Sequence, residues 1–170
     1  LWRWLEELNV PDVDSLRRLY DGAYYEADLP YGRSAPIFLR RSKKQGDKPS
    51  PLLFGLIFKA LLLALRATGV GHNTISGLRA PSRGFADDLV LTTETALGMS
   101  RLLEVVAAFC EWTGARVKLS KSVISAYDFR RRCELPTDTI LYRGSPLVHL
   151  PADKSFPYLG VRASLVSSGG

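Results

Sequence analysis

The chain has 170 residues, of which 46% are hydrophobic and 24% charged, and it carries a formal net charge of +6. This composition is typical of a globular domain and excludes a disordered or fibrous chain. The positive charge favours polyanionic partners without identifying one. The two cysteines, Cys110 and Cys133, are too few for a disulfide scaffold and lack the spacing of metal ligands, which favours an intracellular location in the nucleus or cytoplasm.

Two short helices and a hairpin are predicted in the first 39 residues. Residues 1–8 have an amphipathic helical pattern, and Asp14 is placed to cap a second helix over residues 15–20. No signal peptide or initiator Met precedes them, so both chain ends are expected to be cut from a longer protein. Residues 23–39 are aromatic, small or β-branched and are interrupted by Pro and Gly, which indicates a hairpin with irregular edges.

The most apolar segment follows a basic cluster. Ser50 is a good helix N-cap, and residues 51–67 are apolar on nearly every side of a helix, which predicts the most buried helix of the chain. This segment contains Lys59 and is shorter than the roughly 20 apolar residues of a membrane span, so no membrane partner is expected. The basic cluster before it consists of Arg40, Arg41, Lys43 and Lys44.

An acidic hairpin and an amphipathic helix are predicted next. Residues 70–84 have the composition of a loop, with one short strand near residues 75–78. Residues 84–91 place two β-prone runs around Asp87 and Asp88, which predicts a hairpin with carboxylates at its tip. A helix then runs from its cap Thr95 to Thr113, with Gly114 as its stop and with Met99, Leu102, Val106 and Phe109 on one face.

The rest of the chain has a weaker pattern of short strands. Strands are expected at residues 116–119 and 123–129, on either side of a Ser-Lys-Ser turn, and again at 147–150 and 158–163. The basic run Arg130 to Arg132 follows the second of them. Together with the earlier basic cluster, this run is a candidate for contacts to a nucleic-acid backbone, although a solvated basic surface is the alternative.

The adjacent carboxylates are the first candidate site. Two carboxylates at a hairpin tip suit a hard cation such as Mg²⁺, with Mn²⁺ as an alternative. Neighbouring strand residues point to opposite faces, so Asp87 and Asp88 are not equivalent, and one of them should ligate directly. Aspartate is also common in turns for backbone reasons, so the pair alone does not establish a metal site.

A second segment gives the pair a context. The sequence Gln45-Gly46-Asp-x-x-Ser-Pro-Leu-Leu-Phe, with Asp87 of Phe-Ala-Asp-Asp 42 residues after Gln45, resembles the reverse transcriptases of non-LTR retrotransposons. Residues 114–122 resemble the family's Gly-x-x-x-Asn-x-x-Lys-Thr segment, with Lys118 in place of the Asn. Residues 156–160 resemble its Tyr-Leu-Gly strand. The resemblance extends over nearly the whole chain from about Leu19 onward.

The resemblance implies RNA-templated DNA synthesis by two-metal catalysis, with an RNA template, a DNA primer and deoxynucleoside triphosphates as partners. One Mg²⁺ would activate the primer 3′-hydroxyl, and the other would steady pyrophosphate. The resemblance implies that Asp87 and Asp88 ligate the metal and that Lys121 donates a proton to pyrophosphate. It implies that Gln45 and Gly46 line the pocket for the nucleotide and its template base, and that Phe85 lies near the primer terminus. A primer grip is implied for Tyr158, Leu159 and Gly160. Phe85, Lys121 and Tyr158 each have a simpler reading, as a core residue, a solvated turn lysine and a packing aromatic.

The implied fold is α+β, a palm-like antiparallel sheet of the split βαβ type packed by helices and incomplete at its N-terminal side. As one partial domain, the chain would comprise a fingers–palm connection (1–44), the palm core (45–132) and the end of the palm (133–170).

A further aspartate of the family lies upstream, on a strand within an Ala-Phe-Asp-type motif. The aspartates before Gln45 lie in no such motif; they are Asp12, Asp14, Asp21 and Asp28. The isolated chain is therefore expected to be inactive and to need the missing remainder of the polymerase as a partner. Two alternatives are a non-catalytic nucleic-acid-binding remnant of a decayed element and an unrelated basic α+β domain.

Overall fold

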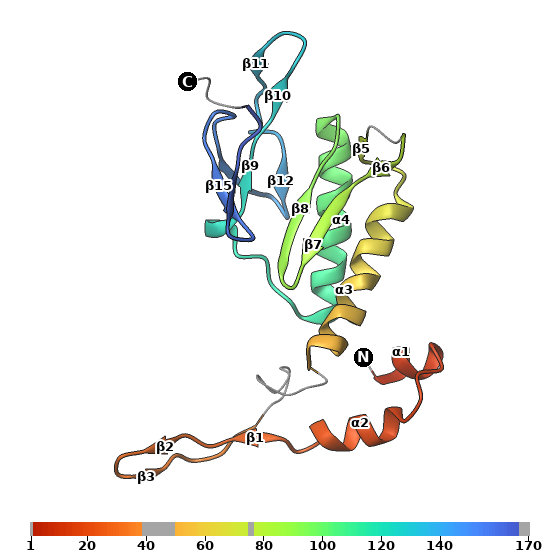
Figure 1. Ribbon diagram of the computed structural model, residues 1–170, viewed down its shortest axis with the longest axis vertical. Coiled ribbons are helices and arrows are strands. Elements are labelled where there is room, and N and C mark those ends of the chain that lie inside the picture. The colour runs from red at the N-terminus through yellow and green to blue at the C-terminus, as the bar shows by residue number, and fades with distance from the viewer. Residues whose placement is uncertain (1, 39–49, 75–76, 167–170) are drawn as a thin grey trace. The chain divides into compact units, whose positions relative to one another are not determined.

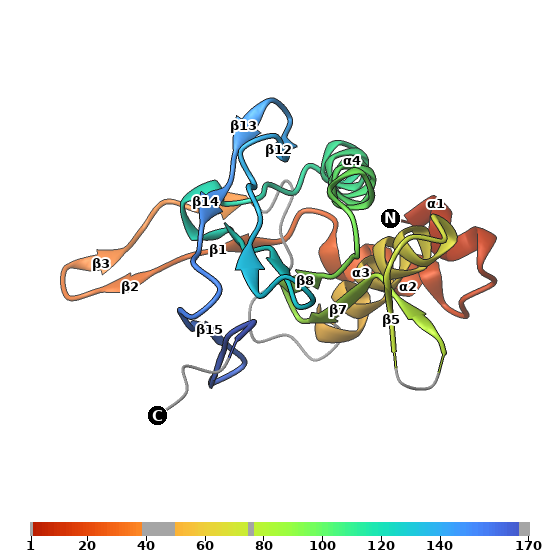
Figure 2. The same ribbon diagram turned by 90° about the horizontal axis from the view of Figure 1, so that it is seen from above.

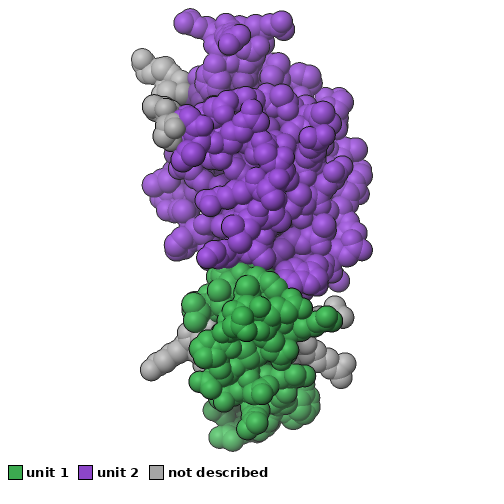
Figure 3. All heavy atoms as spheres, turned by 90° about the vertical axis from the view of Figure 1, so that its right-hand side faces the viewer, with its two compact units in different colours: residues 1–57 green, residues 58–170 purple. Residues whose placement is uncertain are grey.

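The computed structural model describes residues 2–38, 50–74 and 77–166, which are coloured in Figure 1. The chain divides into two compact units, residues 1–57 and 58–170, which Figure 3 shows in different colours. The boundary falls inside helix α3 (Ser50–Ala67), so the first turns of this helix belong to unit 1 and the remainder to unit 2. Each unit has an apolar cluster of its own.

Unit 1 consists of two short helices, a two-stranded ribbon and the start of α3. Its buried cluster is formed by Leu5, Val13 and Leu53. The strands pair antiparallel, β1 with β4 and β2 with β3, so the predicted hairpin over residues 23–39 is confirmed for its described part. The elements are α1 (Trp2–Glu7), α2 (Val13–Tyr20), β1 (Tyr24–Tyr25), β2 (Asp28–Leu29), β3 (Gly32–Arg33) and β4 (Ile37–Phe38).

The predicted cap of the second helix is wrong. Asp14 lies in the first turn of α2, because the helix begins two residues earlier than the pattern indicated. Asp12 occupies the N-cap position in a left-handed conformation and forms no side-chain capping hydrogen bond. The carboxylate of Asp14 still favours the helix, since negative charge in the first turn interacts well with the helix dipole.

Unit 2 is a mixed arrangement of helices and small ladders, which confirms a fold of mixed α and β elements. After α3 come β5 (His72–Asn73), β6 (Arg79–Ala80), β7 (Ser82–Phe85), β8 (Asp88–Leu91), α4 (Ala96–Thr113), the 3₁₀ turn η1 (Leu119–Lys121), β9 (Val123–Ile124), β10 (Tyr127–Asp128), β11 (Cys133–Glu134), β12 (Leu141–Tyr142), β13 (Ser145–Pro146), β14 (Val148–His149), β15 (Phe156–Tyr158) and β16 (Val161–Ala163). Over the described ranges every ladder has two strands; β9 and β14 pair parallel, and the others pair antiparallel.

Helix α4 is the main element of the unit 2 core, and its ends were correctly predicted. The Thr95 hydroxyl accepts a hydrogen bond of 3.0 Å from the Gly98 N–H, and Gly114 ends the helix in the left-handed conformation. The inner face buries Leu102, Leu103, Val106 and Cys110. The pKa of Tyr142 on β12 is raised to about 12. Burial is the largest cause, and a hydrogen bond with Cys110 is the second. Figure 2 shows α3 and α4 side by side, with β7 and β8 beside them.

The prediction that α3 is the most buried helix is wrong. It buries four residues, whereas α4 buries five, and the side chains of Leu52 and Leu63 are 67% and 53% exposed. In unit 2, one side of α3 is packed against other elements, and on this side Leu61 and Leu65 belong to the core. Of the helices in the described part of the chain, α3 alone is long and apolar enough to cross a membrane, with mean hydropathy 1.7. Core helices meet the same criterion, so this property assigns no membrane.

Three predicted segments differ in the structure. Residues 70–84, predicted as a loop, contain the β5–β6 hairpin and most of β7, while residues 75 and 76 lie outside the described residues. Residues 116–118 form no strand and lead into η1. Residues 158–163 form a hairpin rather than one strand, because Leu159 and Gly160 have positive φ angles of 50° and 78° and reverse the chain.

The other strand predictions are largely correct. Residues 147–150 contain β14, and residues 123–129 contain β9 and β10 with a break between them.

Candidate functional site

Asp87 and Asp88 lie at the end of the β7–β8 hairpin, as predicted (Figure 1). Phe85 pairs with Asp88, so Ala86 and Asp87 form a two-residue turn. Ala86 has a φ of 50°, the left-handed conformation that two-residue hairpin turns require at their first position. The two aspartates therefore occupy different positions, Asp87 in the turn and Asp88 at the start of β8.

The inner face of the hairpin packs on the helices. Leu89 and Leu91 contact the unit 2 core. Gly84 is paired with Leu89 and lies against Phe58 and Leu62 of α3. A Cβ atom at Gly84 would overlap the Phe58 ring, so the close approach of β7 to α3 requires glycine at this position. This packing fixes which face of the hairpin points away from the core.

The outer face carries the candidate site. Strand alternation places Arg83, Phe85, Asp88 and Val90 on this face. The Phe85 side chain is 64% exposed, and both aspartates are exposed. Neither aspartate forms an ion pair or a side-chain hydrogen bond with a residue that the structure describes. Their carboxylate oxygens are therefore accessible to a ligand.

The fit of this tip to a divalent metal is partial. Carboxylate oxygens are ligands that Mg²⁺ and Mn²⁺ prefer. Two-metal sites also need carboxylates that bridge both ions, and within the described ranges no group of three or more His, Cys, Asp and Glu could hold a metal ion. Asp87 and Asp88 thus match one side of a divalent-metal site.

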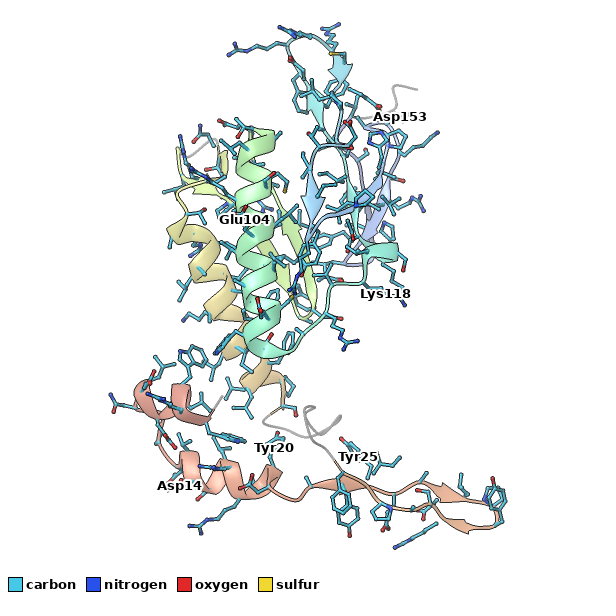
Figure 4. The ribbon with its side chains drawn as sticks, turned by 180° about the vertical axis from the view of Figure 1, so that it is seen from behind. Asp14, Tyr20, Tyr25, Glu104, Lys118 and Asp153 are labelled. Atoms are coloured by element: carbon cyan, nitrogen blue, oxygen red, sulfur yellow. The ribbon has the colours of Figure 1, made fainter. Side chains whose placement is uncertain are left out.

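Lys121 has no polar contact with Asp87 or Asp88 in the part of the chain that the structure describes. It is the last residue of η1 and is exposed. Figure 4 shows Lys118, the residue before η1, on the strand side of unit 2. The role of Lys121 as a proton donor stays a prediction.

The predicted primer-grip segment forms part of the β15–β16 hairpin. Tyr158 ends β15 and is partly buried, whereas Leu159 and Gly160 form the turn and are exposed. The segment forms a turn between β15 and β16 rather than a continuous strand. A role for Tyr158, Leu159 and Gly160 at the primer end stays a prediction.

The remaining predicted site residues lie outside the described residues. They are Gln45 and Gly46 of the nucleotide pocket and the basic residues Arg40, Arg41, Lys43 and Lys44. Their roles stay predictions.

The structure adds one residue that sequence reasoning missed at the hairpin, Arg83. It shares the outer face with Phe85 and Asp88. The sequence signal for Arg83 was its position two residues before Phe85. In a β-strand, residues two apart point to the same face, so a predicted strand at this position also predicts that the two side chains share a face. Two hollows of the surface, of about 610 and 210 Å³, are lined by residues other than Asp87 and Asp88.

Comparisons with known proteins agree with the residue pattern. A family profile described as "Reverse transcriptase (RNA-dependent DNA polymerase)" matches residues 1–163. The chain is 37% identical over 95 residues, 55% of its length, to the "Retrovirus-related Pol polyprotein from type-1 retrotransposable element R2" of Popillia japonica. It is 30% identical over 155 residues, 88% of its length, to the "Retrovirus-related Pol polyprotein from type-2 retrotransposable element R2DM" of Drosophila melanogaster. The matched parts are 13% and 14% of these relatives.

Proposed function

Because the chain belongs to the reverse transcriptase (RNA-dependent DNA polymerase) family of non-LTR retrotransposons, we propose that it supplies the catalytic carboxylate hairpin for RNA-templated DNA synthesis. The observation that carries this proposal is the β7–β8 hairpin, which presents the accessible carboxylates of Asp87 and Asp88. The chain spans about a seventh of these relatives, so an RNA template, a DNA primer and deoxynucleoside triphosphates are the proposed partners of a larger polypeptide.

In this proposal Asp87 and Asp88 hold Mg²⁺, with Mn²⁺ as an alternative. The bound ions supply activation of the primer 3′-hydroxyl and charge neutralisation at the phosphates. We assign direct ligation to Asp87 in the turn and an assisting role at the same site to Asp88, whose side chain points to the outer face of β8. Phe85, exposed beside Asp88, is proposed to lie near the primer terminus.

A palm-like antiparallel sheet is proposed around this hairpin. Support comes from its inner face, which packs on α3 and α4, and from its two outer edges, which pair with no third strand in the described ranges. A strand carrying a further carboxylate can add to either edge by backbone hydrogen bonds. Such a strand would complete the side of the metal site that Asp87 and Asp88 leave open.

Primer extension on an RNA template with Mg²⁺ tests the function. The 170-residue chain alone should give no measurable extension, since its hairpin offers one side of the site. The chain joined to the Ala-Phe-Asp-type strand of a family member should extend the primer. In this extended protein, Asp87→Asn should abolish extension, because it removes a ligand charge at an exposed tip, and Asp88→Asn should reduce it less.

A matched control is Asp138→Asn, which removes the charge of another exposed aspartate without an ion pair to a described residue. This variant should keep full activity. Robust extension by the chain alone would contradict the proposed ligand count, and full activity of the extended Asp87→Asn protein would contradict the site. An inactive extended protein that still binds RNA would favour a non-catalytic remnant.

A further inference from the structure

The β10–β11 hairpin ends in an exposed aromatic residue followed by three arginines. Asp128 pairs with Cys133, which leaves Phe129, Arg130, Arg131 and Arg132 in the loop, here called the arginine tip (residues 129–132). The Phe129 side chain is 68% exposed, and the three arginines are exposed as well. In Figure 1 this hairpin projects beyond the neighbouring strands of unit 2.

Local interactions order the arginine tip. The Asp128 Oδ1 atom accepts backbone hydrogen bonds from the N–H groups of Arg130 at 2.8 Å and Arg131 at 3.0 Å. The Arg131 hydrogen bond is the largest influence on the Asp128 carboxyl and holds its pKa below the ordinary value. The ring of Phe129 meets the ring of Tyr127 edge-on, with centroids 5.2 Å apart. The loop therefore presents Phe129 and the arginines in a defined arrangement.

The base of the hairpin is tied to the rest of unit 2. Glu134 on β11 accepts a hydrogen bond of 2.6 Å from the Ala152 N–H through its Oε1 atom. Its Oε2 atom lies 3.7 Å from Nε2 of His149 on β14. The Thr137 hydroxyl and Nδ1 of His149 are 3.1 Å apart and share a hydrogen bond. These contacts anchor the end of the hairpin opposite to its tip.

The charge of the arginine tip is mostly uncompensated. The Arg131 guanidinium lies 3.7 Å from Asp128 Oδ2, whereas Arg130 and Arg132 form no ion pair in the described part of the chain. The same short loop therefore carries an exposed aromatic ring and two exposed arginines without an ion pair to a described residue. Guanidinium donors match the geometry of phosphate oxygens, and aromatic rings stack on unpaired bases.

From this arrangement we propose that the arginine tip binds single-stranded nucleic acid. Phe129 stacks on one base, and Arg130 and Arg132 contact the flanking phosphates. A single-stranded nucleic acid offers both groups that this loop can bind, phosphates for the arginines and an unpaired base for the ring. The inference rests on the proposed function for its choice of nucleic acid, but it concerns a different ladder from that of Asp87.

Fluorescence anisotropy of the full chain with a labelled uridine oligomer of about 12 nucleotides tests this site. Replacing both Arg130 and Arg132 by Gln should weaken binding and reduce the slope of log affinity against log salt by about 1.4, or about 0.7 for each lost phosphate contact. Phe129→Ala should weaken binding about 5- to 100-fold with an unchanged slope, because stacking carries no charge. Phe129→Tyr should restore the affinity.

The matched control replaces Arg18 and Arg66 by Gln, two exposed arginines that form no ion pair with a described residue. It removes the same charge elsewhere and should leave the affinity nearly unchanged. The proposal is overturned if the unchanged chain does not bind the oligomer, if Phe129→Ala has no effect, or if the control weakens binding as much as the tip variant. Binding of duplex RNA as tight as that of the single strand would also overturn it.

Because this assay needs no catalysis, its failure leaves the Asp87 assignment standing. Loss of primer extension in the Asp87→Asn protein, in turn, should leave oligomer binding unchanged.

Discussion

Two small residues determine how the β7–β8 hairpin presents Asp87. Gly84 lets β7 approach Phe58 on α3, which turns Phe85 and Asp88 outward. Ala86 holds the left-handed conformation of the turn, at a cost to a non-glycine residue of about 1–2 kcal/mol. The packing of the hairpin on the helices offsets that cost, so the position of the candidate site depends on side chains that perform no chemistry.

Gly84→Ala should therefore destabilise the protein. The added Cβ overlaps the Phe58 ring, and overpacking of this kind costs about 1–3 kcal/mol. Gly55→Ala is the matched control, because its added Cβ meets nothing within 4 Å and its helical position gains about 0.5–1 kcal/mol from alanine. Urea unfolding measures both changes. Equal effects of the two substitutions would contradict the close approach of β7 to α3.

Asp128 should give the arginine tip a dependence on pH. The pKa of its carboxyl is lowered from 3.8, and the hydrogen bond from the Arg131 N–H is the largest cause. The ionised carboxylate therefore stabilises the loop above pH 3.8. This stabilisation is lost as the pH falls through the folded-state pKa. The amide resonances of Arg130 and Arg131 should shift in an NMR titration with a midpoint below 3.8. Asp128→Asn should remove that transition. A midpoint at or above 3.8 would contradict the hydrogen-bonded loop.

Helices α3 and α4 both have 18 residues and are rich in apolar side chains, yet they differ in burial. In the core of unit 2, residues of β9 and β12 pack with α4, whereas α3 contributes Leu61, Leu65 and the partly buried Phe58. Hydrophobicity favours burial of any apolar face, but only a neighbouring element can cover it. The composition of α3 therefore overstated its burial.

Substitutions on α4 should reproduce this difference between its two sides. Leu102 is fully buried and Leu97 is 69% exposed. Leu102→Ala should lower the free energy of unfolding by about 2–5 kcal/mol, because it removes core contacts and leaves a cavity. Leu97→Ala should change it by less than about 0.5 kcal/mol. Thermal and urea unfolding would contradict the orientation of α4 if the two substitutions had similar effects.

At the scale of the whole chain, the two units have separate apolar clusters, with Leu5, Val13 and Leu53 in unit 1. The clustered residues of unit 2 all lie at or beyond Phe58. A protein that begins at Ser50 and ends at Val166 keeps the whole of α3 and this cluster, so it should unfold cooperatively in urea. Leu102→Ala should destabilise it as much as the full chain. A noncooperative transition would show that unit 2 needs unit 1 to fold.

Local sequence signals were sufficient for the elements that depend on neighbours along the chain. The cap Thr95, the stop Gly114 and the period of apolar residues between them predicted α4, because helix ends and helix faces are determined within a few residues. The β-prone runs around Asp87 and Asp88 predicted the carboxylate hairpin for the same reason. Two short motifs in the correct order were enough to identify the family, because the residues of each motif lie within a short stretch of the sequence.

Tertiary structure decided what depends on residues far apart in the sequence. The exposed side of α3 and the parallel pairing of β9 with β14 follow from which elements meet, and no local pattern contains that information. The same holds for the functional candidates. The outward turn of Asp88 follows from the fit of Gly84 against α3, and the absence of contacts between Lys121 and the carboxylates within the described residues follows from the position of η1 beside β14. Burial and strand pairing are properties of contacts between distant segments, so they become known only when the chain is folded.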